Sequence, residues 1–295
     1  MLERIPSITA ASVALLRAAA SLPGAPFDTA NDRSLRVLAP RSLELAMRVA
    51  GALTARAPAL HQLGRALSLG LLDHVALRTR AIDIALLAEL ATGTEQVVIC
   101  GAGLDARAFR IPELKDATVL EVDHPATQRL KRARIEGRAP TCRRLTLVPV
   151  DFTRESLDEK LAGAGHDATV PTVWIWEGVT PYLTGDAIAA TLAVIVRRSA
   201  PRSLALVTYA LPTMAGVRSV GLTVDRVGAP VLWAFGALGE PLEGRMETSE
   251  LRTMAEPLGL TMERDEGSDE WGRAHLRGEA TAIRIDERLA ALRKR

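Results

Sequence analysis

The chain has 295 residues, of which 48% are hydrophobic and 24% are charged, and its basic and acidic residues nearly balance at a net charge of +2. This composition is typical of a globular protein and excludes a disordered chain or a dedicated polyanion binder. An aromatic content of 3% excludes a base-stacking surface for nucleic acid. The length fits one large α/β domain with additions, so we expect a single domain over residues 1–295.

The first apolar segment, residues 8–16, predicts a helix. Residues 8, 12, 15 and 19 fall at helical spacing and Arg17 interrupts the apolar run, which favours an amphipathic helix over a cleaved export signal. No uncharged stretch approaches the roughly 20 residues needed to cross a bilayer. The two cysteines, Cys100 and Cys142, are too few for a disulfide framework or a structural zinc site. We therefore expect a cytoplasmic protein with no metal and no membrane anchor.

Residues 1–92 predict a helical N-terminal cap. Leu, Val and Ile recur there at three- and four-residue intervals, and no convincing strand is present. Pro40, Pro58 and Gly93 are typical of helix boundaries. The expected helices cover 42–57, 59–70 and 74–91.

Residues 95–210 predict a doubly wound, mostly parallel sheet of Rossmann-like type. Short β-branched runs at 96–100, 117–122, 145–150, 172–176 and 203–209 alternate with helical stretches at 125–137, 153–163 and 185–199. Ligands of such sheets bind beyond the carboxyl ends of the strands. The residues that follow each strand are therefore the candidates for a site.

The alternation stops after residue 210. Residues 211–248 are rich in Gly, Pro and Met and are predicted to form a lid insertion, in which apolar side chains would suit a hydrophobic ligand or a buried contact. Residues 249–295 are predicted to hold a helix near 249–258 and strands at 260–264 and 281–285.

A glycine motif follows the first predicted strand. Gly101 and Gly103 match the dinucleotide pattern G-x-G-x-x-[GA], but a pyrophosphate in this loop would meet the carboxylate of Asp105. A hydride-transfer set such as Tyr-x-x-x-Lys is also missing, since Tyr182 is followed four residues later by Asp186. S-adenosyl-L-methionine (SAM) has no phosphate and an ammonium group, which would tolerate the acid.

Acids stand at or after the carboxyl ends of three further predicted strands, namely Asp123, Asp151 and Glu177. The geometry of SAM suits them, because an acid after the second strand can accept the ribose hydroxyls and Asp151 can accept the adenine amino group. Glu177 could instead cap the next turn, and its position favours a functional role. His124 is expected to pack or cap a loop, and the basic run of residues 129–138 to be the solvent-exposed face of a helix.

Four segments resemble the leucine carboxyl methyltransferase family, which includes bacterial O-methyltransferases associated with polyketide biosynthesis. They are VVICGAGLDARAFRI (97–111), LEVDHPATQRLK (120–131), VPVDF (148–152) and WEGVTPYLT (176–184). The resemblance extends from 77–83 through 239–251 and the final helix. It implies a class I SAM-dependent methyltransferase fold and SAM as the cofactor.

The resemblance also implies roles for individual residues. Arg78 would pair with the SAM carboxylate, and the glycine loop would back the methionine part. Asp123 would bind the ribose, Asp151 and Phe152 the adenine, and Glu177 would face the methionine end. Val75 and Ile82 place Arg78 beside the buried face of its helix, although a snorkelling arginine is the alternative. In full, the expected cofactor-binding residues are Arg78, Gly101, Gly103, Asp123, Asp151, Phe152 and Glu177.

The sequence therefore predicts a SAM-dependent O-methyltransferase acting on a carboxylate or hydroxyl of a small hydrophobic metabolite such as a polyketide. A carboxylate acceptor is already ionised at neutral pH and needs no base, whereas a hydroxyl would need one. Glu177 and Tyr182 are the catalytic candidates, with His124 or a lid residue as other choices for the base. An NAD(P)-dependent oxidoreductase and a catalytically silent SAM-fold binding protein remain as alternatives.

Overall fold

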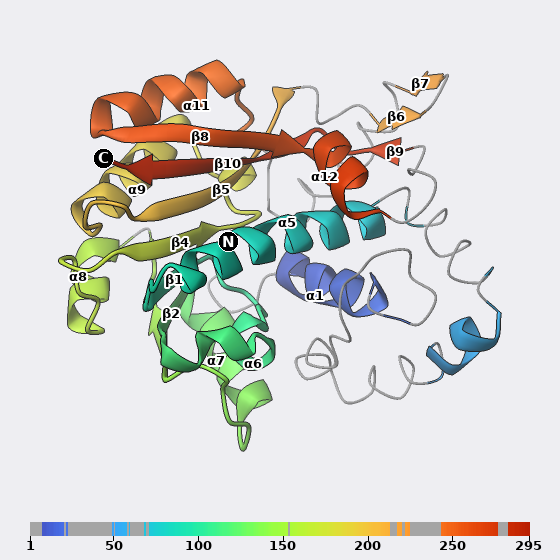
Figure 1. The fold of residues 1–295 in the computed structure, drawn as a ribbon, viewed down its shortest axis with the longest axis horizontal. Coiled ribbons are helices and arrows are strands. Elements are labelled where there is room, and N and C mark those ends of the chain that lie inside the picture. The colour runs from blue at the N-terminus through green and yellow to red at the C-terminus, as the bar shows by residue number, and fades with distance from the viewer. Residues whose placement is uncertain are drawn as a thin grey trace.

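A seven-stranded sheet forms the centre of the molecule (Figure 1). In this computed structural model of the chain, the residues described are 8–20, 22, 49, 51–57, 59, 68, 71–152, 154–212, 217–219, 222–224, 243–276 and 283–295. The strand order is β3-β2-β1-β4-β5-β10-β8. The predicted mostly parallel α/β sheet is confirmed.

The first five strands run parallel and coincide with the predicted runs to within one or two residues. They are β1 (Gln96–Cys100), β2 (Thr118–Asp123), β3 (Arg144–Pro149), β4 (Thr172–Trp176) and β5 (Leu204–Ala210). β1 pairs with β2 on one side and β4 on the other, so its side chains are buried throughout. Its apolar, β-branched sequence suits a strand with no solvent-facing side.

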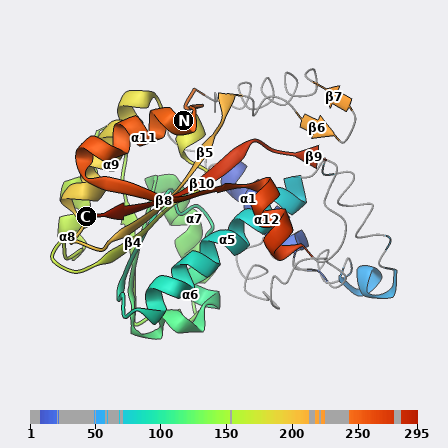
Figure 2. The same cartoon turned by 45° about the horizontal axis from the view of Figure 1, so that its top comes forward.

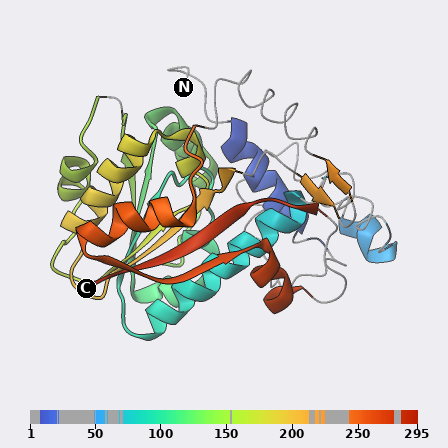
Figure 3. The same cartoon turned by 90° about the horizontal axis from the view of Figure 1, so that it is seen from above.

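Helices cover both faces of the sheet (Figures 2 and 3). Alternate strand residues enter two separate cores. Val97 and Ile99 pack with α5 (Leu71–Ala91), η1 (Pro112–Asp116) and α12 (Ser268–His275). Val98 and Cys100 pack on the opposite face with α8 (Leu157–Gly163), α9 (Gly185–Arg197) and α11 (Thr248–Ala255). Trp174 and Trp176 lie in this second core.

The predicted helical cap is confirmed where it is described. α1 (Ile8–Ala20) packs against α5, and residues 51–56 are also helical. Most of the predicted helix 59–70 lies outside the described residues. Two further helices follow strands near the sheet's carboxyl edge, α6 (Arg107–Arg110) and α7 (Pro125–Ile135).

The C-terminal part of the sheet differs from the prediction. β8 (Leu260–Gly267) begins where a strand was expected, but it pairs only through β10 (Glu287–Lys294), a strand that was not predicted. β10 runs antiparallel between β5 and β8. Charges at both of its ends and alanines in its middle give it little local strand character, so its tertiary pairing decides its conformation.

Within the expected strand 281–285, the described residues Ile283–Arg284 form the strand β9. This strand belongs to a small sheet with β6 (Val217–Ser219) and β7 (Leu222–Val224), apart from the main sheet. The helix α12 was not predicted either. Most of the lid insertion 211–248, including most of the apolar residues expected to line it, lies outside the described residues. Among the helices described, none has the length and apolar character of a membrane span.

Candidate functional site

The chain makes a tight turn directly after β1, and the last residue of β2, Asp123, lies beside it. Gly101 and Gly103 have φ angles of 68° and 50°, in the left-handed region that favours glycine. A Cβ on Gly101 would also lie 2.2 Å from Cγ2 of Val179, so this position needs glycine for space as well as conformation. Asp123 accepts hydrogen bonds from the backbone N–H groups of Gly103 and His124, each at 2.6 Å. Burial raises the pKa of Asp123.

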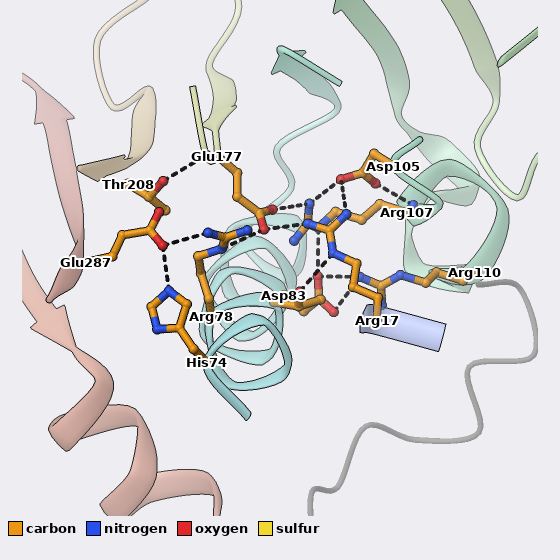
Figure 4. A network of polar contacts seen from close by, with 12 residues as sticks. Arg17, His74, Arg78, Asp83, Asp105, Arg107, Arg110, Glu177, Thr208 and Glu287 are labelled. Atoms are coloured by element: carbon orange, nitrogen blue, oxygen red, sulfur yellow. Dashed lines mark hydrogen bonds and ion pairs between the residues drawn. The ribbon is translucent and has the colours of Figure 1, made fainter. Parts of the chain in front are cut away.

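Glu177, immediately after β4, is the centre of a buried network of charged side chains (Figure 4). Its carboxylate contacts Arg17 from α1, Nε of Arg78 at 3.0 Å and Nη1 of Arg107 at 2.9 Å. Burial alone would raise the pKa of Glu177, but the three guanidinium groups outweigh it and hold the pKa well below its usual value. Glu177 therefore stays ionised at neutral pH, and it does not cap the following turn.

Arg78 reaches this network from α5. Val75 and Ile82 beside it are buried, as expected, and the guanidinium is itself buried rather than snorkelling. Nε donates to Glu177 and Nη1 donates to Glu287 at 2.6 Å. Desolvation opposes the charge of Arg78, yet the two carboxylates raise its pKa, so it remains a cation.

Arg107 joins the glycine loop to the same network. Its side chain is buried and contacts Asp83 at 2.8 Å, Asp105 and Glu177. Asp83 also pairs with Arg110 at 2.7 Å. Burial favours a raised pKa for Asp105, but Arg107 and Arg17 outweigh it and the pKa is lowered. The carboxylate of Asp105 is neutralised inside the protein, so it does not exclude a phosphate in the way that the sequence argument assumed.

Three further predicted residues lie on the segments that follow β3 and β4. Asp151 follows β3, is partly exposed and stands 3.8 Å from Arg154, and Phe152 beside it is 52% exposed. Because β3 is separated from β1 by β2, both belong to the outer part of the carboxyl edge. Tyr182 ends the short helix η2 (Thr180–Tyr182) and is partly buried.

Two expectations about polar residues near α7 had different outcomes. His124 caps this helix by accepting a hydrogen bond from the N–H of Ala126 at 3.2 Å, which confirms its capping role. Lys131, which was expected on a solvent-exposed helix face, is instead fully buried and pairs with Glu121 of β2. Burial raises the pKa of Glu121 to about 7 although Lys131 opposes the shift.

Sequence reasoning assigned no site role to several members of the network, among them Arg17, His74, Arg107 and Glu287. The local signal for Arg17 is its position as the one charge in an apolar helix, which by itself argues only against an export signal. Arg107 lies within a quoted motif but had no role assigned. Glu287 belongs to the strand that was not predicted.

The arrangement offers a set of groups suited to an amino acid joined to a ribose. Nη2 of Arg78 has no hydrogen-bond partner among the described residues and can receive a carboxylate, while Glu177 can receive an ammonium group. Asp123, at the end of the neighbouring strand, can accept hydroxyl groups. The carboxylate, ammonium and ribose of SAM therefore match the chemistry of these residues.

Comparison with known proteins connects this site to one family. A family model described as leucine carboxyl methyltransferase matches residues 10–196. A protein of Streptomyces coelicolor with the provisional name S-adenosyl-L-methionine-dependent methyltransferase is 39% identical over 165 residues, which cover 55% of this chain and 58% of the relative. A Mycobacterium tuberculosis protein with the same provisional name is 35% identical over 173 residues, covering 58% and 55%.

The chain thus spans a little over half the length of the curated relatives it matches. Among solved structures, magnesium protoporphyrin IX methyltransferase from Synechocystis is similar to 76% of this chain, covers 86% of its own length, and has 13% sequence identity and a TM-score of 0.44. The mitomycin 7-O-methyltransferase is similar with a TM-score of 0.45, at 17% identity, over 76% of this chain and 57% of its own.

Proposed function

The chain belongs to the leucine carboxyl methyltransferase family, and we propose that it transfers the methyl group of SAM to an oxygen atom of a small hydrophobic metabolite such as a polyketide. Its α/β sheet is of the class I SAM-dependent methyltransferase type. The observation that carries the proposal is the buried ion pair between Arg78 and Glu177 beside the glycine turn after β1.

Each part of the site has a role in holding the cofactor. Arg78, assisted by Arg17, binds the carboxylate of the methionine end, and Glu177 binds its ammonium group. A zwitterion can bind beside this pair, because its carboxylate can reach Nη2 of Arg78 and its ammonium group supplies a counter-ion to Glu177. Gly101 and Gly103 let the backbone approach, Asp123 binds the ribose, and Asp151 with Phe152 binds the adenine.

Bound SAM supplies a methyl group activated by a positively charged sulfur. The chain's task is to hold the acceptor oxygen in line with this methyl group and to exclude water, because proximity and desolvation both accelerate a reaction in which charge is neutralised. A carboxylate acceptor needs no base. For a hydroxyl acceptor, Tyr182 is the candidate to take the proton.

Calorimetric titration with S-adenosylhomocysteine (SAH) tests the cofactor assignment. We expect one site in the wild-type protein and at least tenfold weaker binding in Arg78→Ala and in Asp123→Ala, which corresponds to about 1.4 kcal/mol or more. Arg143→Ala is the matched control, since Arg143 forms an exposed ion pair with Glu95 at the opposite edge of the sheet. Unchanged affinity in both site variants would refute the assignment.

Methyl transfer from SAM to carboxylic acids and phenols then tests turnover. We expect Glu177→Ala to lower the rate even at saturating SAM. Binding of SAH without transfer to any acceptor would favour a catalytically silent binding protein. Binding of NAD or NADP in place of SAH would favour the oxidoreductase, which family membership disfavours.

A further inference from the structure

Glu287 is a buried acid that the proposed function does not yet use. It lies at the start of β10, is 3% exposed, and falls outside residues 10–196 that match the family model. β10 is antiparallel to β5 and Glu287 pairs with Ala210, so the strand brings this acid to the carboxyl edge of the parallel strands. Glu287 therefore reaches the site from a part of the chain remote from the motifs.

One oxygen of Glu287 makes both of its side-chain contacts (Figure 4). Oε2 accepts from Nη1 of Arg78 at 2.6 Å and lies 2.6 Å from Nε2 of His74. Oε1 is buried and has no hydrogen-bond partner among the described residues. Burial would raise the pKa of Glu287, but Arg78 and His74 lower it to about 2, so the group accepts and His74 donates.

The imidazole ring of His74 is itself fixed by contacts on the side away from Glu287. Its Nδ1 lies 3.1 Å from Oγ of Ser268, and that hydroxyl lies 3.0 Å from the carbonyl oxygen of Ile285. The imidazole ring also packs against Trp271, with ring centres 5.8 Å apart. The position of Oε2 is thus determined by α12 and the segment before β10, not by Arg78 alone.

The effect on Arg78 follows from the shape of the guanidinium group. It is planar, and Glu177 and Glu287 hold Nε and Nη1, so the plane is fixed and the third nitrogen, Nη2, remains. Gly178 leaves room beside it, since a Cβ there would lie 3.7 Å from Nη2. An arginine binds a carboxylate most strongly when its plane is already oriented, because paired hydrogen bonds need that geometry.

We propose that Glu287, supported by His74, is a positioning residue that orients Arg78 so that Nη2 faces the cofactor carboxylate. The proposal rests on the proposed function, because it assumes that the carboxylate belongs to SAM or SAH. It assigns to the C-terminal strand a part in cofactor binding, exerted through a hydrogen bond to Oε2.

The structure makes a specific prediction about substitutions of Glu287. Because both contacts use the same oxygen, Glu287→Gln keeps one acceptor that can serve Arg78 and His74 together. Glu287→Ala removes the acceptor. We expect the Gln variant to bind SAH within threefold of wild type or more tightly, and the Ala variant to bind it at least tenfold more weakly.

Calorimetry with two ligands separates this role from a general effect on the fold. 5′-Methylthioadenosine has the adenosine and sulfur of the cofactor but no amino-acid end, so its affinity should be the same in wild type, Glu287→Gln and Glu287→Ala. Glu263→Ala is the matched control. Glu263 lies on β8, next to β10, and forms an exposed ion pair with Arg293 of β10. It should bind both ligands normally.

A double-substitution cycle tests whether Glu287 acts through Arg78. In an Arg78→Ala background, Glu287→Ala should not weaken SAH binding further. If Glu287→Ala alone does not fold, Glu287→Met, which retains the bulk without the acceptor, replaces it in both experiments.

Several results would overturn the positioning role. One is that Glu287→Ala binds SAH with wild-type affinity, and another is that it loses affinity for SAH and 5′-methylthioadenosine equally. The role is also overturned if Glu287→Gln loses as much SAH affinity as Glu287→Ala, or if the affinity losses of Arg78→Ala and Glu287→Ala are additive in the double variant. These results differ from failure of the proposed function, in which the wild-type protein itself would bind neither SAH nor 5′-methylthioadenosine.

Discussion

Around Glu177, buried arginines and acids are matched in number as well as in position. Arg17, Arg78, Arg107 and Arg110 face Asp83, Asp105, Glu177 and Glu287. Burying ion pairs brings a desolvation cost that well-packed apolar residues would avoid. Their concentration at the carboxyl edge of the sheet therefore favours a binding role over a purely stabilising one.

Some residues of the site could be named from the sequence, and others could not. Arg78, Asp123 and Glu177 could be named because each stands at a motif or a strand end. Arg17 and Glu287 could not, because their partners are 160 and 209 residues away along the chain. Lys131 was misassigned because it stands in a basic run whose members Arg129 and Arg132 are exposed. The buried acid Glu121 on the adjacent strand explains its position.

Gly101 allows a prediction at the scale of one residue. Gly101→Ala combines a positive φ with a collision against Val179, so we expect a stability loss of about 2 kcal/mol or more and loss of SAH binding. Gly93→Ala is the control, because Gly93 has a φ of 91° but nothing within 4 Å of an added Cβ. Gly93→Ala should lower the free energy of unfolding by about 1 kcal/mol and leave SAH binding intact. Urea unfolding measures both, and equal losses would contradict the collision.

Among the elements, α1 reaches the site through the side chain of Arg17. Arg17 donates from α1 to Thr79 Oγ1 of α5 at 3.1 Å and contacts Glu177 beyond β4. The helix was predicted from its spacing, but its docking was not, since an Ala-rich helix has few distinctive packing features. The position of α1 and the charge at the site are consequently coupled.

Arg17→Met tests this coupling while keeping most of the apolar stem. Removing the guanidinium leaves Glu177 with Arg78 and Arg107, so the fold should persist while α1 loses the polar contacts of Arg17. We expect faster amide exchange in Ile8–Ala20 and several-fold weaker SAH binding. Hydrogen exchange by mass spectrometry and calorimetry measure the two effects. Unchanged exchange in α1 would show that its apolar contacts alone hold it.

For the whole molecule, the sequence predicted the parallel half of the sheet well and the antiparallel half poorly. β1 to β5 alternate with helices, and the connection between consecutive strands is short enough to leave a clear pattern. β10 pairs with β5 across more than seventy residues, and its alanines and terminal charges suggest no strand. β10 was not predicted because its conformation depends on long-range pairing, which local sequence does not encode.

The buried acids predict how the whole molecule responds to acid. The pKa values of Glu177, Asp105 and Glu287 are lowered, so their contribution to stability is present above the unfolded values near 4 and is lost as the pH falls. For Glu287, whose pKa falls from 4.5 to about 2, the loss between pH 6 and pH 3 is on the order of 2 kcal/mol.

Unfolding in urea across this pH range measures that loss. Glu287→Gln should show a shallower fall in stability than wild type, since its side chain does not titrate. The stability of Glu263→Ala should fall as steeply as that of wild type, because the Glu263 side chain is exposed and forms its ion pair at the surface. Parallel curves for Glu287→Gln and wild type would contradict the lowered pKa.

The placement of β10 also affects the order in which the protein can fold during synthesis. β8 leaves the ribosome before β10, yet its neighbour in the sheet is β10, and the edge of β5 likewise stays unpaired until β10 emerges. Domains generally fold from the N-terminal side as the chain is made. Here the nascent chain would hold an open sheet edge, a target for chaperones, until Glu287 and its strand close the sheet and complete the cofactor site in one step.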